Sequence, residues 1–472
     1  MRVIQSSSIK GTVVLVAFAV LGLSSGAQSP AEAPVATAVR AFLAAFNSGD
    51  RRELERFATE RMALRQATPQ EVAAQMTKDY QRTGGFEMQR LLVQTPTRAT
   101  ASVRTRQGGE AWQLQFEVEA APPHRIVRFG VEVGGAGDQG GPDPTAGILP
   151  PAVKAGMTDT EMAKVIEDYL GRLAAADRFS GAALLAREGK ILFKIAHGLA
   201  DKGLNVANRT DTKFNLGSIN KIFTLVALTE LVAEGKLAWQ DTIAKYLPDY
   251  PKPAGDRITI EQLTEHRSGL GDIFGPELDQ APRNRFRKPT DYFPLFASKP
   301  LLFEPGSSQG YSNAGFMVLG AVIERASGTD YFSFVRQRVY QPAGMTDTDA
   351  FEADRPVPNQ AEGYIREQDG SYRSNVFVRL YKGSPAGGGY STLDDLLRFT
   401  EAIRSGRLPL RGFSPGRAPR IAWAGGAPGT NSAVMLEGDY TLIVLSNYDP
   451  TIATAIASEV RKAIAAARPG LP

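Results

Sequence analysis

The chain has 472 residues, a formal net charge of +4 and a hydrophobic fraction of 43%, which predicts two or three globular domains and does not point to nucleic acid as a partner. It contains no cysteine, which excludes disulfides, thiolate catalysis and cysteine-ligated metals. The only histidines, His124, His197 and His266, lie far apart in the sequence, so we expect no metal site.

The first 27 residues are predicted to be a secretory signal peptide. Arg2 and Lys10 provide a basic start, and the apolar run from Thr12 to Leu23 is too short for a comfortable membrane span. Ser25-Gly26-Ala27 then supplies the small residues that precede a signal-peptidase cut. We therefore expect an exported bacterial protein, periplasmic or extracellular, with no membrane span after signal removal. An uncleaved anchor is the alternative.

Residues 30–133 are predicted to form a small α+β domain, and residues 134–157, rich in Gly and Pro, a linker. Helical periodicity occupies residues 36–83, and alternating patterns predict strands at Met88–Gln94, Arg98–Thr105, Ala111–Val118 and Arg125–Val133. The segment AFLAAFNSGDRRELERFA and the strand order resemble the cone-shaped nuclear-transport-factor-like and polyketide-cyclase-like domains. This resemblance implies a structural or ligand-binding accessory domain.

Residues 158–472 are predicted to form a second, larger domain. Alternation at Ser180–His197 and Leu436–Ser446 predicts strands near both ends, with helices between them and a closing helix at Ile452–Ala466. One antiparallel sheet built from both ends of the domain and covered by helices is expected, which is an α+β fold.

Two short segments carry residues suited to hydrolysis. Ser218 and Lys221 are one helical turn apart and share a face, so the amine can help to remove the hydroxyl proton. Tyr311-Ser312-Asn313 adds a second proton carrier and an amide. A phenol of ordinary pKa is a poor base at neutral pH, but an adjacent ammonium favours its phenolate. Alternatively, Ser218 is only a helix cap and Lys221 a surface residue.

With its neighbouring segments, this pattern resembles the serine β-lactamase and penicillin-recognising hydrolase superfamily, particularly its class C and esterase-like members. The matching segments between residues 158 and 465 are FNLGSINKIFT, ITIEQLTEHRSGL, FEPGSSQGYSNAGFMVLGAVIE, SPAGGGYSTLDDLLRF and GGAPGTNS. The resemblance implies a β-lactamase-like antiparallel sheet flanked by helices. It also implies that Ser218 is the nucleophile, that Lys221 and Tyr311 share the proton transfers, and that Asn313 holds the ester or amide group.

A third element departs from that superfamily, whose members usually carry Lys-Thr-Gly or His-x-Gly on a strand beside the site. The corresponding residues are Trp423-Ala424-Gly425. Gly425 still allows a close approach of the backbone, and the N–H of Gly426 would pair with that of Ser218 as an oxyanion donor. Trp423 offers an apolar surface instead of a basic group. The chain between Phe399 and Trp423 is also short, so an edge strand is expected to be missing or remodelled.

The predicted function is that of an exported serine hydrolase that forms an acyl-enzyme with a small ester, amide or peptide. Because of Trp423, esterase or D-amino-acid peptidase-like activity is favoured over efficient β-lactam hydrolysis. No metal or organic cofactor is expected. The Gly-x-Ser-x-Gly pattern at Gly306–Gly310 is expected to be a loop, because no histidine follows His266. The alternative is a catalytically weak or inactive binding protein that retains the fold.

Overall fold

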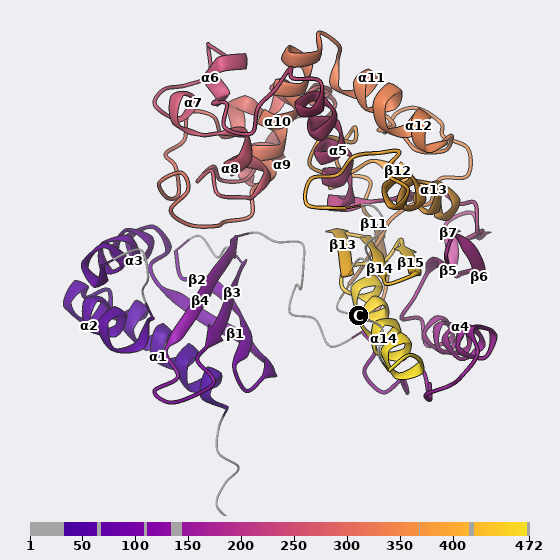
Figure 1. Ribbon diagram of the computed structural model, residues 1–472, viewed down its shortest axis with the longest axis horizontal. Coiled ribbons are helices and arrows are strands. Elements are labelled where there is room, and N and C mark those ends of the chain that lie inside the picture. The colour runs from indigo at the N-terminus through magenta and orange to yellow at the C-terminus, as the bar shows by residue number, and fades with distance from the viewer. Residues whose placement is uncertain are drawn as a thin grey trace, which may run out of the picture.

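The computed structural model describes residues 33–63, 68–107, 111–133, 144–367, 369–414 and 420–469. The predicted signal peptide and the first half of the predicted linker therefore lie outside the described residues. Figure 1 shows a small N-terminal unit beside a larger unit that holds the rest of the described chain. No helix among the described residues is both long enough and apolar enough to cross a membrane.

The N-terminal unit consists of three helices and a four-stranded antiparallel sheet in the order β1-β2-β3-β4. Asp50 caps α2 by accepting from the backbone N–H groups of Arg52 and Glu53, and Thr68 and Glu71 form a capping box on α3. The bounds are α1 Pro34–Ser48, α2 Arg51–Arg61, α3 Pro69–Thr83, β1 Phe86–Thr95, β2 Arg98–Thr105, β3 Ala111–Val118 and β4 Ile126–Val133.

Aromatic rings occupy the space between the helices and the sheet of this unit. The ring of Phe42 lies 5.3 Å from that of Phe116 and 4.8 Å from that of Phe129, centroid to centroid. Phe46 stacks on Phe86 at 4.5 Å. These buried rings stabilise the unit by apolar burial.

The larger unit is built on a five-stranded antiparallel sheet in the order β13-β14-β15-β5-β6. The strands are β5 Gly181–Arg187, β6 Lys190–His197, β13 Arg420–Ala427, β14 Thr430–Glu437 and β15 Tyr440–Ser446. β15 pairs with β5, so the sheet joins the two ends of the domain as the sequence predicts. The predicted pair of late strands corresponds to β14 and β15, and β14 begins at Thr430, earlier than the predicted Leu436. The additional strand β13 forms one edge of the sheet.

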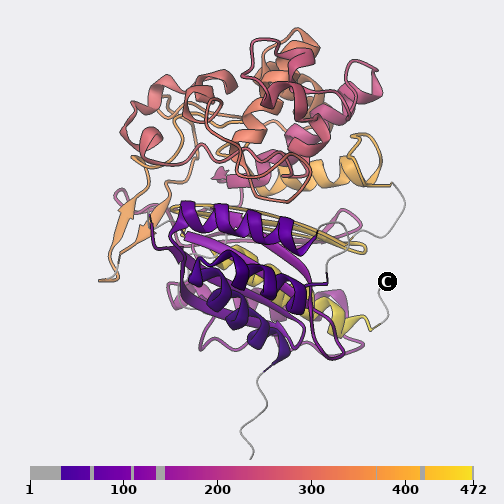
Figure 2. The ribbon, with the colours of Figure 1, turned by 90° about the vertical axis from the view of Figure 1, so that its left-hand side faces the viewer.

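Both faces of this sheet are covered, and β5, β14 and β15 are accordingly buried along nearly their whole length. On one face, Ala183 and Leu185 pack with α4 (Asp159–Ala175) and α14 (Ile452–Ala467). On the other face, Leu184 and Leu445 join the larger core made with α5 (Asn220–Ala233), α10 (Asn313–Ser327) and α13 (Leu393–Arg404). Figure 2 shows this helical half (magenta to orange) above the helices of the N-terminal unit (indigo).

Shorter elements connect these layers. The short strands are β7 Leu199–Asp201, β8 Val206–Ala207, β9 Phe214–Asn215, β10 Tyr364–Arg366, β11 Tyr372–Ser374 and β12 Tyr390–Ser391. The short α-helices are α6 Ile243–Tyr246, α7 Ala254–Arg257, α8 Ile260–Thr264, α9 Pro276–Gln280, α11 Tyr331–Val335 and α12 Gln341–Ala343. The 3-10 segments are η1 Gly217–Ile219, η2 Arg283–Arg285 and η3 Pro289–Leu295, and η4 Arg336–Tyr340 is a π-helical turn.

Candidate active site

Ser218 lies in the tight turn η1, directly before α5. The backbone of Gly217 has φ +51°, a conformation that favours glycine, and a Cβ there would lie 2.6 Å from the backbone N of Gly426. The turn therefore brings Ser218 against β13. Ser218 itself remains partly exposed. The α-helix that carries Lys221 begins at Asn220.

Lys221 is 5% exposed, and its Nζ is surrounded by oxygen atoms. It donates to Asn313 Oδ1 at 2.7 Å, to the Ala386 carbonyl at 2.6 Å and to Ser218 Oγ at 3.2 Å. An ammonium has three N–H donors, and these three acceptors suit that charged form. Lys221 is therefore an internal residue of the site and not a surface residue.

The hydroxyl groups of Ser218 and Tyr311 lie 2.6 Å apart, the distance of a short hydrogen bond. Since Ser218 Oγ already accepts from Lys221, its own proton is available for Tyr311 Oη. The Lys221 ammonium also lies 4.7 Å from the centroid of the Tyr311 ring. The arrangement brings together the serine, the amine and the phenol that the sequence singled out.

His266 supports Tyr311 from the other side. Its ring stacks on the Tyr311 ring at 4.6 Å, and its Nδ1 accepts from the backbone N–H of Ser312 at 3.1 Å. Desolvation, reinforced by the charge of Lys221, lowers the pKa of His266 to about 3. A neutral imidazole that already accepts at Nδ1 acts as a structural support and not as a general base.

Asn313 begins α10 and makes contacts with both ends of its amide. Its oxygen accepts from Lys221, and its nitrogen donates to both carboxylate oxygens of Asp272, at 3.1 and 2.8 Å. The sequence analysis missed Asp272. The signal was close at hand, because Asp272 follows the quoted segment ending at Leu270 by only Gly271.

The opposite wall of the site is the backbone of β13. A Cβ on Gly425 would lie 1.9 Å from the Leu216 carbonyl oxygen and 2.9 Å from the backbone N of Ser218. Only glycine permits this approach, which brings the Gly425–Gly426 segment beside the N–H of Ser218. The structure therefore places these two glycines next to the predicted nucleophile.

Trp423 lies on the same strand but packs elsewhere. Its ring lies 6.3 Å from that of Phe399 on α13, and it is a partly buried member of the larger core. β13 forms the edge of the sheet, and no strand of the described residues pairs with its outer side. Residues 415–419 of the segment before Trp423 lie outside the described residues, so the expectation of a missing or remodelled edge strand stays a prediction.

The Gly306–Gly310 segment forms turns and leads directly to Tyr311, as expected.

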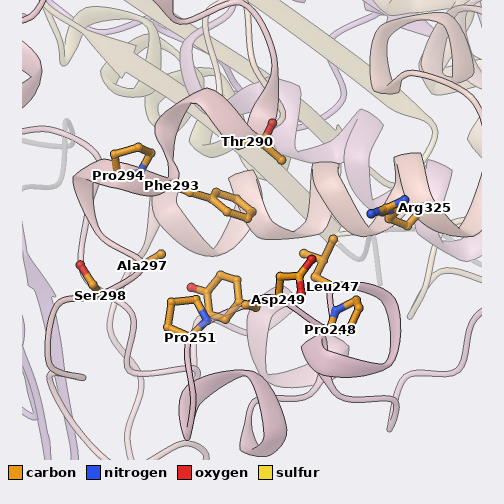
Figure 3. A pocket seen from close by; sticks show the side chains of 11 residues that line it. Leu247, Pro248, Asp249, Pro251, Thr290, Phe293, Pro294, Ala297, Ser298 and Arg325 are labelled. Atoms are coloured by element: carbon orange, nitrogen blue, oxygen red, sulfur yellow. The ribbon is translucent and has the colours of Figure 1, made fainter.

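A separate cavity of about 460 Å³ lies at the far end of α10, where Figure 3 shows the ring of Phe293 above Pro251 and Arg325 at the opposite side of the view. Arg325 is separated from Asn313 by about 18 Å along the helix axis, at 1.5 Å per residue. This cavity is therefore remote from Ser218. The described residues contain no cluster of His, Asp and Glu suited to a metal ion.

An antiparallel sheet joined from both ends of its domain, with helices on both faces and the polar cluster at its edge strand, defines the β-lactamase type of α+β fold. The chain belongs to the Beta-lactamase family, which matches residues 162–414, more than half of the chain. The match includes the segments of Ser218 and Tyr311 and ends before β13. The predicted superfamily and fold class are thus confirmed. The resemblance predicted for the N-terminal unit stays a prediction.

Similar proteins include penicillin-binding proteins and an esterase. The chain is 32% identical to the esterase EstB of Burkholderia gladioli over 312 residues, which are 57% of this chain and 75% of that protein. It is 27% identical to penicillin-binding protein 4* of Bacillus subtilis over 325 residues, or 60% and 71% of the two chains. A solved penicillin binding protein from Bacillus halodurans has 26% identity and a TM-score of 0.57, covering 62% of this chain and 99% of that one.

Proposed function

We propose that this protein is an exported serine hydrolase that cleaves a small ester or amide through an acyl-enzyme on Ser218. The observation that carries the proposal is the position of Ser218 Oγ, 2.6 Å from Tyr311 Oη and 3.2 Å from Lys221 Nζ. A serine hydroxyl becomes a nucleophile when a neighbouring group removes its proton. Membership of the Beta-lactamase family and the likeness to an esterase support the same reading.

In the acylation step, Ser218 Oγ attacks the substrate carbonyl carbon as its proton passes to Tyr311 Oη. The Lys221 ammonium favours the phenolate form of Tyr311 that accepts this proton. The backbone N–H groups of Ser218 and Gly426 donate to the oxyanion of the tetrahedral intermediate. The intermediate then collapses, and the leaving alcohol or amine takes the proton from Tyr311.

In the deacylation step, a water molecule gives a proton to Tyr311 and attacks the acyl carbon. The same backbone N–H groups stabilise the second tetrahedral intermediate. Ser218 leaves as an alkoxide and recovers its proton from Tyr311, so the site returns to its starting state. The net reaction consumes one water and releases an acid together with an alcohol or amine.

The substrate class follows from the two walls of the site. Lys221 is the cation of the helix wall, and it is already bonded to three oxygen atoms. On β13, Trp423 stands where superfamily members usually carry a basic residue or histidine. We therefore propose a preference for esters over efficient β-lactam hydrolysis, because the free carboxylate of a β-lactam substrate lacks a cation on that strand. D-amino-acid peptides or amides are also proposed substrates, and those without a free carboxylate are expected to react better.

The nucleophile is tested by labelling the purified protein with a fluorophosphonate or a fluorescent penicillin. We expect labelling of the wild type that disappears in Ser218→Ala, with the thermal unfolding temperature retained. Ser405→Ala is a matched control, because Ser405 is an exposed serine at the end of α13 whose Oγ donates to the Glu401 carbonyl at 2.8 Å. Unlabelled wild-type protein with an intact fold would support the alternative, a binding protein that has kept the fold.

The substrate preference is tested by comparing turnover of p-nitrophenyl esters, a D-alanyl dipeptide and a chromogenic cephalosporin. Esters are expected to react fastest, and faster cleavage of the cephalosporin would refute the preference.

Export is a separate proposal. We expect the mature protein in the periplasm or medium to begin near Gln28, which N-terminal sequencing would determine.

We further propose that residues 158–472 form the hydrolase domain and residues 30–133 an accessory domain. Separate apolar cores support this division, since the described residues that form the core of the N-terminal unit all lie between Ala33 and Phe129. Removal of residues 28–140 is expected to leave ester turnover within a few-fold of the full chain. Complete loss of turnover in a folded product would show that the first unit takes part in the main function.

A further inference from the structure

The orientation of the Asn313 amide determines whether Lys221 Nζ faces a hydrogen-bond acceptor or a donor. The side chain presents an acceptor at one end and N–H donors at the other. Its oxygen faces Lys221 at 2.7 Å, and Asn313 is only 6% exposed. If the amide were turned over, an N–H would point at the ammonium, which has only donors of its own. Whatever fixes this amide therefore keeps an acceptor in front of Lys221.

Asp272 is the group that fixes it. Both of its carboxylate oxygens accept from Asn313 Nδ2, at 3.1 and 2.8 Å, and a carboxylate cannot accept from the carbonyl end of an amide. The backbone N–H groups of Ile273 and Phe274 donate to the same carboxylate at 2.7 and 3.1 Å. All of these partners are donors, so the ionised carboxylate fits its surroundings.

The segment that carries Asp272 is itself tied to the start of α10. Ser312 caps the helix by accepting from the backbone N–H of Gly315 at 3.0 Å. The same hydroxyl donates to the carbonyl of Gly271 at 2.6 Å. Gly271 directly precedes Asp272, so the cap holds the carboxylate and the Asn313 amide in a fixed relation. Asp272 and Asn313 are therefore held together by several hydrogen bonds between their two segments and not by a single contact.

We propose that Asp272 is a positioning residue for the acylation reaction, which locks the Asn313 amide so that its oxygen holds Lys221 beside Ser218 and Tyr311. The inference rests on the proposed function for its catalytic meaning, whereas the effect on Lys221 is independent of any activity. Asp272 also supplies a negative charge that balances the ammonium through the amide between them.

The titratable groups that face Lys221 are Tyr311, His266 and Asp272. The low pKa of His266 leaves its ring neutral at neutral pH. The N–H donors around Asp272 favour the ionised form of its carboxyl group. Desolvation raises the pKa of Asp272, while the Phe274 N–H, the Asn313 amide and Lys221 oppose that rise. Loss of the carboxylate therefore removes charge stabilisation from the Lys221 ammonium as well as its acceptor.

The test is the variant Asp272→Asn in the full mature protein, which keeps the shape of the side chain and an acceptor for the Ile273 and Phe274 N–H groups. The new amide can donate to Asn313 Oδ1, which lets the Asn313 amide turn over. We expect the rate of Ser218 acylation by a p-nitrophenyl ester to fall about 10²-fold, mainly in kcat and with a smaller change in KM.

A second measurement follows Lys221 directly, by NMR of protein labelled at the lysine ε-carbons, with the signal assigned by its loss in Lys221→Met. We expect the apparent pKa of Lys221 to fall by roughly one unit or more in Asp272→Asn, because both an acceptor and a charge are lost. Asp394→Asn is the matched control. Asp394 pairs with Lys194 at 3.0 Å, so this variant is expected to leave Lys221 and the acylation rate unchanged.

The two measurements separate the possible failures. An unchanged Lys221 titration in Asp272→Asn would overturn the inference, whatever the rate does. A shifted titration with an acylation rate within about threefold of wild type would refute the catalytic part. A wild-type protein that is never acylated, but whose Lys221 titration still depends on Asp272, would refute the proposed function while supporting the positioning of Lys221.

Discussion

The two walls of the site are built on opposite principles. The helix wall, at the starts of α5 and α10, presents Ser218, Lys221 and Asn313 as side chains bonded to one another. The strand wall, on β13, presents the backbone of Gly425 and Gly426, where a Cβ would collide. The comparison teaches that one wall depends on particular functional groups and the other on the absence of side chains. Substitutions should therefore affect the two walls in different ways.

The largest effect is expected at Lys221. Lys221→Met keeps the length of the side chain but removes the charge and the bond to Ser218. We expect kcat for ester hydrolysis to fall at least about 10³-fold, as when one member of a catalytic group is removed. Steady-state and pre-steady-state kinetics would measure it. Lys236→Met, an exposed lysine just beyond the other end of α5, is the control, and equal behaviour of the two variants would contradict the role of Lys221.

The strand wall is tested by Gly425→Ala. The added methyl group would lie 1.9 Å from the Leu216 carbonyl oxygen, so β13 must move away and carry the Gly426 N–H with it. We expect about a 10²-fold loss in kcat, in the range found for loss of one oxyanion donor. Ala424→Ser, an exposed neighbour on the same strand, should retain activity. Normal kinetics in Gly425→Ala would refute the account of this wall.

Trp423 sharpens the comparison, because it lies on the strand wall but packs into the core beside Phe399. We expect Trp423→Ala to reduce the free energy of unfolding by about 2–4 kcal/mol through lost packing, while KM for a neutral ester changes only a few-fold. Chemical denaturation and ester kinetics would test this. The opposite result, a large rise in KM with unchanged stability, would assign Trp423 to the substrate.

His266 makes the stability depend on pH, an effect that vanishes above pH 6.5. Its pKa is about 3 in the folded protein and near 6.5 when unfolded, so the unfolded chain binds the proton more readily. Its contribution to stability is therefore fully present above pH 6.5 and is lost as the pH falls towards 3, by at most about 1.4 kcal/mol per pH unit. His266→Asn suits the backbone φ of +57° and should show a shallower fall in urea midpoint between pH 7 and 4. An equal slope in both proteins would contradict this.

Much of the helix wall was predictable from the sequence, because Ser218 and Lys221 are one turn apart and helical spacing alone places them on one face. The alternation in β5 and β15 likewise predicts the sheet that joins both ends of the domain. These are local signals. The contact between Ser218 and Tyr311 is not local, and only the superfamily resemblance brought those two residues together before the structure was known.

Asp272 was missed for a physical reason. It touches neither Ser218 nor Lys221 through a bond in the structure, and its effect passes through the orientation of one amide. No periodic pattern encodes such an indirect contact. Trp423 posed the reverse problem, since its position on the strand was predicted but its direction depends on packing against Phe399. Which core residue the ring contacts requires the three-dimensional structure.

The pairing of β15 with β5 has a consequence for biosynthesis. Ala183 on β5 lies opposite Val444 on β15, although nearly the whole domain separates them in the chain. Contacts of such long sequence separation form slowly, because a large loop must close first. The sheet, and with it the wall of β13, can only be completed after the final strands have left the ribosome. The edge of β5 that pairs with β15 therefore stays unpaired until nearly the whole chain has been synthesised.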